Sequence, residues 1–315
     1  MIRQERFAMS LVRVKAPATT ANMGPGYDCL GMALDVWNTL EVQTLGSGEP
    51  VVEISGEGAG ELGTGRDNLV YRSMEFLFHE AGQDMPTVRI RCKNDIPLAR
   101  GMGSSAAAIA GGLVAANAIC SQDFTANELL EMAATIEGHP DNVAAAVMGG
   151  MQLVIVDHTD GGRQLYTVPV NVPPEMRAVI FVPDVRIATD DARAVVPEKV
   201  SIADAVHNMG RVGLLVASMV TNHLEYLAIA TQDRLHQPYR QPLVPAMKVI
   251  FNAALDAGAL GVFLSGSGST VLALTQGREM TVAYEMAEAA RQASVEGNVH
   301  VTQPTPLGAH LTAQE

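Results

Sequence analysis

The sequence predicts an α+β protein with two domains, and three observations lead to this fold class. A glycine- and serine-containing turn at 96–105 runs directly into an alanine-rich helix. Strand-like and helical patterns are mixed in both halves of the chain. The pattern changes near 160–172, where paired glycines are followed by prolines. We therefore place one domain over 1–165 and a second over 166–315.

The first half should form a sheet that is covered by helices. Alternation of apolar and polar residues predicts strands at 11–15, 38–43, 51–55, 88–92 and 151–157. Residues 16–30 are rich in Pro, Gly and Asn and are expected to form a loop. Helices are expected at 68–81, 104–119, 125–136 and 142–148. The third of these begins with a capping-box pattern, Thr125 followed by Glu128.

The second half alternates between the two kinds of element. Strands are expected at 178–182, 262–265, 270–275 and 299–301, the second and third paired across a glycine-rich turn. Helices are expected at 203–220, 223–231, 244–257 and 279–296. Gly258 follows the third helix at the position where glycine commonly ends one.

Composition excludes several classes of function. A formal net charge of −13 gives no general attraction to nucleic acid or to an anionic membrane. The most apolar run, 106–119, falls short of the ~20 residues that a membrane span needs. Three scattered cysteines indicate a reducing compartment, and residues 1–6 are charged with no apolar segment behind them. We expect a cytoplasmic protein.

The turn before the alanine-rich helix has the features of a phosphate-binding site. Gly101 and Gly103 remove side-chain bulk where a ligand approaches the backbone. The helix that follows offers unpaired N–H groups and the positive end of its dipole. An anionic phosphate is the ligand that such a helix start binds best.

Other interpretations of this turn must be weighed. A P-loop is excluded, because no Lys follows the glycines and the cation, Arg100, precedes them. A dinucleotide fingerprint fits G-x-G-x-x-A, with Asp123 in the acidic position, but 93–100 separates the turn from its strand. A purely structural alternative is a helix start that Ser104 caps.

Two further segments concentrate polar side chains. The first, 17–28, places Asn22 and Asp28 on a glycine-rich turn that could hold hydroxyl and ammonium groups, although local turn bonds would explain it too. The second, 137–142, contains Glu137, His139, Asp141 and Asn142, a set suited to a divalent metal and a reacting hydroxyl. Its structural alternative is a helix at 143–148 capped by Asp141 or Asn142.

Two arginines and a small-residue turn complete the candidates. Arg193 lies in T-D-D-A-R and Arg240 in P-Y-R, and arginine suits bidentate binding of a carboxylate. Each alone is more typical of a solvated loop. Gly266 lies in L-S-G-S-G-S-T, where small residues permit close approach of a substrate or of another segment.

Taken in order, these segments resemble the GHMP small-molecule kinases, and within them the homoserine kinases. The resemblance rests on P-A-T-T-A-N-M-G-P-G-Y-D, I-P-L-A-R-G-M-G-S-S-A-A, E-G-H-P-D-N-V-A-A-A-V-M-G-G, T-D-D-A-R-A-V-V-P and G-V-F-L-S-G-S-G-S-T-V. It covers roughly 14–275. The departures are Met102, where the family has Leu, and Ala145, where it often has Pro.

The resemblance implies an N-terminal domain like domain 2 of ribosomal protein S5 and a ferredoxin-like C-terminal domain. It also implies a homodimer that phosphorylates the hydroxyl of L-homoserine with ATP and Mg²⁺, towards threonine. The implied ATP site is Pro97, Leu98, Ala99, Arg100, Gly101, Met102, Gly103, Ser104, Ser105, Ala106 and Ala107, with Asn68 near the adenine.

For the remaining roles, the resemblance assigns Mg²⁺ to Glu137 and to Ser105, or to Ser104 beside it. The residues expected around homoserine are Asn22, Asp28, His139, Asp141, Asn142, Arg193, Arg240 and Gly266. Glu137, Asp141, Asn142 and Arg193 are the candidates for catalysis, and whether Asp141 acts as a base stays open.

Three other functions remain as alternatives. Another acceptor of the same kinase class, such as mevalonate or a sugar, lacks the ammonium group that Asp28 would bind. A nucleotide sensor without catalysis would not need to keep both a serine pair and Glu137. A dehydrogenase is the function that the dinucleotide fingerprint would imply.

Overall fold

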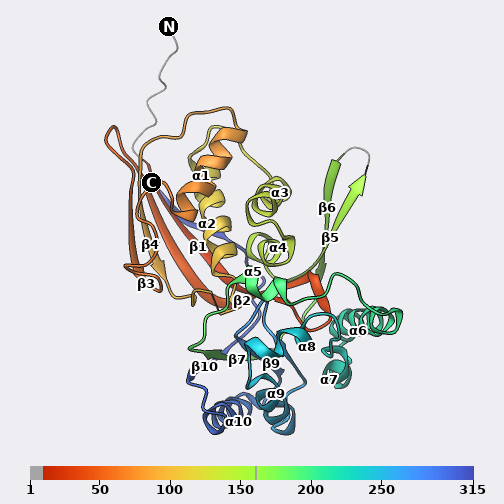
Figure 1. Cartoon of the computed structure of the whole chain (residues 1–315). Coiled ribbons are helices and arrows are strands. Elements are labelled where there is room, and N and C mark those ends of the chain that lie inside the picture. The colour runs from red at the N-terminus through yellow and green to blue at the C-terminus, as the bar shows by residue number, and fades with distance from the viewer. Residues whose placement is uncertain (1–9, 160–161) are drawn as a thin grey trace.

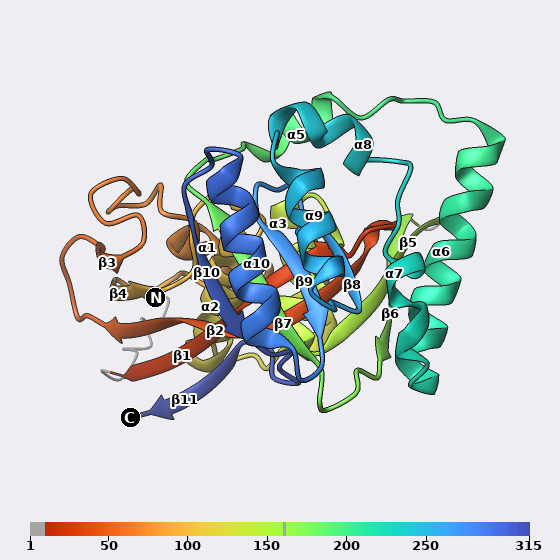
Figure 2. The same ribbon diagram turned by 90° about the horizontal axis from the view of Figure 1, so that it is seen from below.

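The computed structural model describes residues 10–159 and 162–315. Within these residues the strands form a seven-stranded sheet and a four-stranded sheet. The motifs named above lie almost entirely inside the described ranges, whereas residues 1–6 and part of the expected domain junction lie outside them. Figures 1 and 2 show the two sheets and their covering helices from two directions.

The first sheet has the strand order β11-β1-β2-β4-β3, and β5 pairs with β2 and with β6. Its strands are β1 (Leu11–Asn22), β2 (Gly26–Thr44), β3 (Val51–Gly56), β4 (Val88–Asn94), β5 (Met151–Thr159), β6 (Gly162–Val170) and β11 (His310–Gln314). Helices α1 (Leu69–Glu80), α2 (Ser104–Ile119), α3 (Ala126–Glu137) and α4 (Pro140–Met148) pack on one face of this sheet (Figure 1).

The second sheet has the order β10-β7-β9-β8, built from β7 (Arg177–Pro183), β8 (Gly261–Leu264), β9 (Val271–Thr275) and β10 (Gly297–Thr302). Helices α9 (Met247–Asp256) and α10 (Glu279–Gln292) cover one face (Figure 2). The other elements are α5 (Thr189–Ala194), α6 (Ile202–Thr221), η1 (Leu224–Tyr226), α7 (Leu227–Ala230), α8 (Gln237–Arg240) and η2 (Gln241–Leu243).

Alternation along β7 explains how the two halves are joined. Val179 and Phe181 pack into the core beneath α9 and α10, whereas Ala178 and Ile180 face the opposite way. That second core also contains residues of β1 and β2 such as Leu34. The four-stranded sheet is thus buried on both faces, and one apolar core continues from the first half into the second.

Small residues place α2 at the centre of the first half. A Cβ on Gly111 would come within 3.0 Å of the Leu40 side chain, and one on Gly112 within 3.0 Å of the Val70 carbonyl. The alanine-rich helix predicted at 104–119 is therefore confirmed, and most of its residues are buried. Close packing therefore fixes the position of the N-terminus of α2, and of its N–H groups, relative to the sheet.

Most predicted elements are confirmed, and the clearest error concerns 16–30. The structure has no long loop there: β1 continues to Asn22, Met23–Pro25 forms a tight turn, and β2 starts at Gly26. The prediction overvalued the Pro, Gly and Asn content. Alanines and threonines in this stretch are buried and pair with the long strand β2, which decides the outcome.

Smaller corrections follow the same logic. Strands β6 and β11 were missed, because both are mostly exposed and carry little apolar alternation. The helix expected at 142–148 begins at Pro140, and the stretch 223–231 divides into η1 and α7. Gly258 does follow α9, with φ of +98°. The proposed boundary after residue 165 falls inside β6, and it remains a proposal.

Candidate active site

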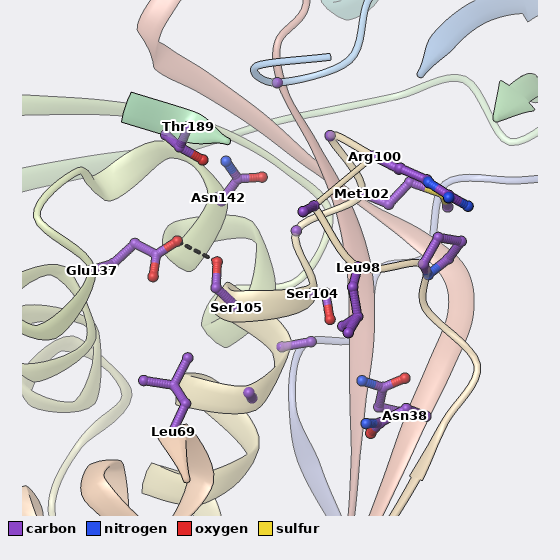
Figure 3. A pocket seen from close by; sticks show the side chains of 18 of the residues that line it. Asn38, Leu69, Leu98, Arg100, Met102, Ser104, Ser105, Glu137, Asn142 and Thr189 are labelled. Carbon is purple, nitrogen blue, oxygen red and sulfur yellow. Dashed lines mark hydrogen bonds between the residues drawn. The ribbon is translucent and has the colours of Figure 1, made fainter. Parts of the chain in front are cut away.

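A cavity of about 480 Å³ lies where the N-terminal ends of α2 and α4 meet segments from the second half. Every site residue predicted from the sequence lines it except Ala106, which is fully buried in the core of the first half. Figure 3 shows Ser104 and Ser105 at the start of α2, with Glu137, Asn142 and Thr189 around them. Segments far apart in the sequence therefore converge on one space.

The start of α2 is left open to the cavity. The N-cap is Gly103, with φ of +64°, and no side chain caps the helix. The alternative in which Ser104 caps α2 is therefore wrong, since Ser104 is already inside the helix. The uncapped N–H groups of the first turn and the dipole of the helix are available to an anion.

The glycines of this turn are required by close contacts. Gly101 has φ of +48°, and a Cβ there would lie well under 3.0 Å from the Ser265 carbonyl oxygen. A Cβ on Gly103 would collide in the same way with the Thr19 side chain. Ser265 Oγ also donates to the Gly101 carbonyl. The turn is therefore held against the second half of the chain through its backbone.

Ser105 and Glu137 form the candidate metal site. Ser105 Oγ donates to Glu137 Oε1 at 2.6 Å, from the start of α2 to the last residue of α3 (Figure 3). Hydroxyl and carboxylate oxygens are ligands that Mg²⁺ accepts, with phosphates and water completing its shell. Among the described residues, no cluster of three or more His, Cys, Asp or Glu side chains could hold a metal ion without such help.

His139, Asp141 and Asn142 lie beside this pair, at the start of α4. His139 is the N-cap without a side-chain cap bond, so the alternative in which Asp141 or Asn142 caps the helix is wrong. The side chain of Asp141 is 3% exposed, and its Oδ1 accepts the N–H of Asn142 at 2.8 Å. Thr19 Oγ1 donates to Asn142 Oδ1 at 2.8 Å and orients that amide.

The environment of His139 favours its charged form. Burial lowers the pKa of His139, but a hydrogen bond to Asp141 and the charges of Asp141 and Glu137 outweigh burial, so the pKa is raised. His139 Nδ1 lies 3.2 Å from Asp141 Oδ1. The imidazolium therefore compensates the two carboxylates that gather at this end of the cavity.

We expect His139→Gln to lose stability in a pH-dependent way. Because the folded-state pKa of His139 is raised, its contribution is fully present below the unfolded value near 6.5 and is lost as pH rises through the folded value. The difference in unfolding free energy between wild type and variant should be largest near pH 5.5 and shrink towards pH 9, measured by urea denaturation. The exposed His158→Gln serves as control. A difference that does not change with pH would contradict the assignment.

On the opposite side, Asp28 and Arg193 join the two halves of the chain. Arg193 donates from Nη1 to Asp28 Oδ2 at 3.0 Å and from Nη2 to Oδ1 at 2.7 Å. This hydrogen bonding to Asp28 raises the pKa of Arg193. Asn22 accepts the N–H of Asp28 at 3.0 Å and donates to the Gly266 carbonyl at 2.8 Å.

Arg240 is the most deeply placed cation of the site. It is 2% exposed, yet its guanidinium donates to the carbonyls of Ala192 at 3.0 Å and Gly266 at 2.9 Å. Burial lowers the pKa of Arg240, and the guanidinium remains charged at neutral pH. Both guanidinium groups lie near the Tyr27 ring, with its centroid 5.4 Å from Arg240 Cζ and 5.7 Å from Arg193 Cζ.

Sequence reasoning missed the apolar end of the cavity and several supporting residues. Leu69 and Leu98 line the end away from Thr189 (Figure 3), and Ile54 and Leu62 are further apolar residues of the cavity wall. Asn68 lines the cavity but uses its side chain locally, accepting the N–H of Val70 and donating to Gly63. Other missed residues are Thr19, Tyr27, Asn38 and Thr189, of which all but Asn38 lie inside a quoted motif.

Comparison with known families decides the assignment. The model described as "GHMP kinases N terminal domain" matches residues 68–150, which contain the α2 turn and the Glu137–Asn142 segment. The model "GHMP kinases C terminal" matches residues 206–292. The chain belongs to the GHMP kinase family. It is a phosphotransferase that acts on a hydroxyl group, which excludes the dinucleotide-binding alternative.

Curated relatives of this GHMP kinase cover nearly its whole length. A homoserine kinase of Moorella thermoacetica is 42% identical over 301 residues, covering 96% of this chain and 99% of the relative. A homoserine kinase of a Synechococcus strain is 42% identical over 282 residues, covering 90% of this chain and 89% of the relative. The similarity therefore extends over most of both halves of the chain.

Solved structures agree with the fold. A homoserine kinase from Cytophaga hutchinsonii superimposes with a TM-score of 0.84 at 29% identity, covering 99% of each chain. A mevalonate kinase of L. major, in complex with R-mevalonate, gives a TM-score of 0.70 at 14% identity and covers 92% of this chain. The predicted two-domain GHMP kinase fold is thus confirmed. No helix among the described residues is long and apolar enough to cross a membrane.

Proposed function

We propose that this GHMP kinase transfers the γ-phosphoryl group of ATP to the side-chain hydroxyl of L-homoserine. The products are O-phospho-L-homoserine and ADP, a step towards threonine, and the enzyme acts in the cytoplasm. The observation that carries the proposal is that one cavity contains both the phosphate-binding turn and charged groups of both signs. Asp28 can bind the ammonium group of a zwitterion, and Arg193 and Arg240 can bind its carboxylate. The curated relatives named homoserine kinase support the same acceptor.

ATP is proposed to bind with its phosphates at the first turn of α2 and its base at the apolar end. The residues that line this part are Asn68, Pro97, Leu98, Ala99, Arg100, Gly101, Met102, Gly103, Ser104, Ser105 and Ala107. Leu69 and Leu98 offer apolar surface for a nucleobase. The N–H groups of α2 neutralise phosphate charge. Ser105 and Glu137 would hold Mg²⁺, which offsets charge on the transferring phosphoryl group when bound.

L-homoserine is proposed to bind between Asp28 and Arg193, so that its charged groups replace part of the direct contact between the two side chains. Its ammonium group would contact Asp28 and the Asn22 amide oxygen, and its carboxylate would contact Arg193 and Arg240. The paired charges are already partly desolvated, with side chains 33% and 35% exposed for Arg193 and Asp28. A zwitterion replaces both partners at once, so no charge is left unpaired.

The chain's own groups mainly position the reactants. Phosphoryl transfer needs alignment and charge neutralisation more than covalent help from the protein. Asp141 is fixed by the Asn142 N–H and His139, and it lines the cavity beside Glu137. Two routes remain for the hydroxyl proton: Asp141 accepts it, or it leaves with the phosphoryl group and solvent.

The acceptor is tested by a coupled ADP-release assay. The panel is homoserine, mevalonate, shikimate and galactose, each with and without Mg²⁺. We expect turnover with homoserine alone and dependence on Mg²⁺. Preference for mevalonate or a sugar would overturn the acceptor but leave the kinase class intact. Nicotinamide cofactors, titrated in parallel, should not bind.

Arg193→Ala should weaken homoserine binding more than it slows turnover. Loss of a charge-assisted hydrogen bond worth about 2 kcal/mol predicts a rise in KM of about 30-fold. The ATP KM should stay near normal, since Arg193 lines the part of the cavity where homoserine, the phosphoryl acceptor, is proposed to bind (the acceptor end). Arg91→Ala is the matched control, an exposed arginine whose partners are Glu41 and Glu53. An unchanged homoserine KM would remove Arg193 from the carboxylate site.

We also propose that the enzyme is a homodimer through α6, which lies at the edge of the molecule (Figure 2). Its outer face exposes Ile202 (82%), Val206 (57%), Met209 (65%) and Val220 (55%), spaced three to four residues apart or by multiples of that spacing. Such an apolar face is typical of an interface between copies. Wild type should sediment as a dimer and Met209→Lys as a monomer; a monomeric wild type would refute this.

A further inference from the structure

A buried polar cluster lies behind the acceptor end of the cavity. It joins residues 24–28 of the first half, which span the end of the tight turn and the start of β2, to the segment 233–240 of the second. The side chains of His236 and Asp233 are both 0% exposed. His236 does not line the cavity and was not among the candidates from the sequence. Burying an imidazole is costly unless each of its nitrogens has a partner.

The partners of His236 determine its protonation. Arg240 Nη1 lies 3.1 Å from His236 Nδ1, and because a guanidinium can only donate, Nδ1 must be an acceptor. Nε2 lies 2.7 Å from the Gly24 carbonyl, which can only accept, so Nε2 carries the proton. His236 is therefore the neutral Nε2–H tautomer, and burial, the largest effect, lowers its pKa accordingly.

These two hydrogen bonds are part of a closed hydrogen-bond network beside the acceptor end. Arg240 Nη1 donates both to His236 Nδ1 and to the Gly266 carbonyl. The same carbonyl also accepts a hydrogen bond from Asn22 Nδ2. Asn22 directly precedes the Met23–Pro25 turn, and the carbonyl of Gly24, inside that turn, accepts the hydrogen bond from His236 Nε2. The Tyr27 ring stacks on the imidazole with centroids 5.2 Å apart.

The cluster itself is rigidly held. Asp233 accepts the N–H groups of Leu235, His236 and Gln237 at 2.9, 3.0 and 2.7 Å. Asn208 of α6 donates to Asp233 at 2.7 Å and to the Pro25 carbonyl at 3.2 Å. The Gly24–Pro25 turn is thereby fixed by two second-half side chains, so His236 has little freedom to choose another partner.

We infer that His236 is a positioning residue that holds Arg240 and the Gly24 turn as one unit and so sets the affinity for the acceptor's carboxylate. This inference rests on the proposed function, because it takes Arg240 as the group that meets that carboxylate. His236 touches neither reactant. It acts by keeping a buried guanidinium aimed at the cavity instead of at alternative backbone carbonyls.

Three variants separate the two bonds. His236→Ala removes both, His236→Asn keeps an acceptor near the Nδ1 position, and His236→Gln keeps a donor near the Nε2 position. We expect His236→Ala to raise the homoserine KM about 10- to 100-fold with kcat and the ATP KM changed less than about threefold. His236→Asn should recover most of the loss and His236→Gln less. His223→Ala, on an exposed histidine, is the control.

A second measurement is independent of activity. Nitrogen-15 NMR of labelled histidines should show one neutral Nε2–H imidazole that does not titrate between pH 5.5 and 8 and disappears in His236→Asn. An imidazolium or an Nδ1–H tautomer would overturn the inference. So would an unchanged homoserine KM in His236→Ala, or equal damage to both KM values and kcat. If wild type does not use homoserine, the proposed function fails, and the NMR result still decides the state of His236.

Discussion

Glu137→Ala should lower kcat about a thousandfold or more, which corresponds to losing ~4 kcal/mol of transition-state stabilisation. Glu137 is the carboxylate that meets Ser105 at the start of α2, at 2.6 Å. Its side chain is 11% exposed, so water cannot easily replace it. Removing it takes away the charged ligand proposed for Mg²⁺ beside the turn where the phosphates are proposed to bind.

The measurement is kcat at saturating ATP and homoserine over a range of Mg²⁺ concentrations. Glu137→Gln keeps the shape of the side chain without its charge and should be almost as slow. Glu80→Ala, at the exposed end of α1, is the control and should be normal. Near-normal turnover of Glu137→Ala would end its role as a metal ligand.

Gly101→Ala should damage both stability and nucleotide binding. The new Cβ would collide with the Ser265 carbonyl oxygen, and φ of +48° is itself unfavourable for alanine. We expect a loss of about 2 kcal/mol or more in unfolding free energy from strain and collision together. Displacement of the turn should also raise the ATP KM by about tenfold or more, since the N–H groups no longer align.

Gly82→Ala separates the two causes. Gly82 also has positive φ, +64°, but a Cβ there would meet no atom within 4 Å. Gly82→Ala should lower the unfolding free energy by about 1 kcal/mol and leave the ATP KM unchanged. Urea denaturation and initial rates measure both variants. If Gly101→Ala behaved like Gly82→Ala, the close contact with Ser265 would not control the turn.

The sequence allowed accurate prediction where local chemistry decides the structure. The α2 helix, its glycines and the Thr125–Glu128 capping box follow from short-range rules, and the structure contains all of them. The stretch 16–30 was mispredicted, because its Pro, Gly and Asn content indicates a loop while long-range pairing with β2 makes it a strand. Burial of alanines there has no local signature.

The candidate site shows the same division. Motifs identified Glu137, Asp28 and Arg193, but not that Asp28 and Arg193 would pair across the two halves. The sequence could not indicate His236 either, because its partner Gly24 lies more than two hundred positions away and only folding brings them together. Apolar residues such as Leu69 look like ordinary core until the cavity is seen.

The most direct test of the account is a crystal structure with a non-hydrolysable ATP analogue, Mg²⁺ and L-homoserine. The account predicts the β- and γ-phosphates on the N–H groups at the start of α2, the metal against Ser105 and Glu137, and the carboxylate of homoserine on Arg193 and Arg240. A triphosphate bound elsewhere, with the first turn of α2 contacting only solvent, would contradict it.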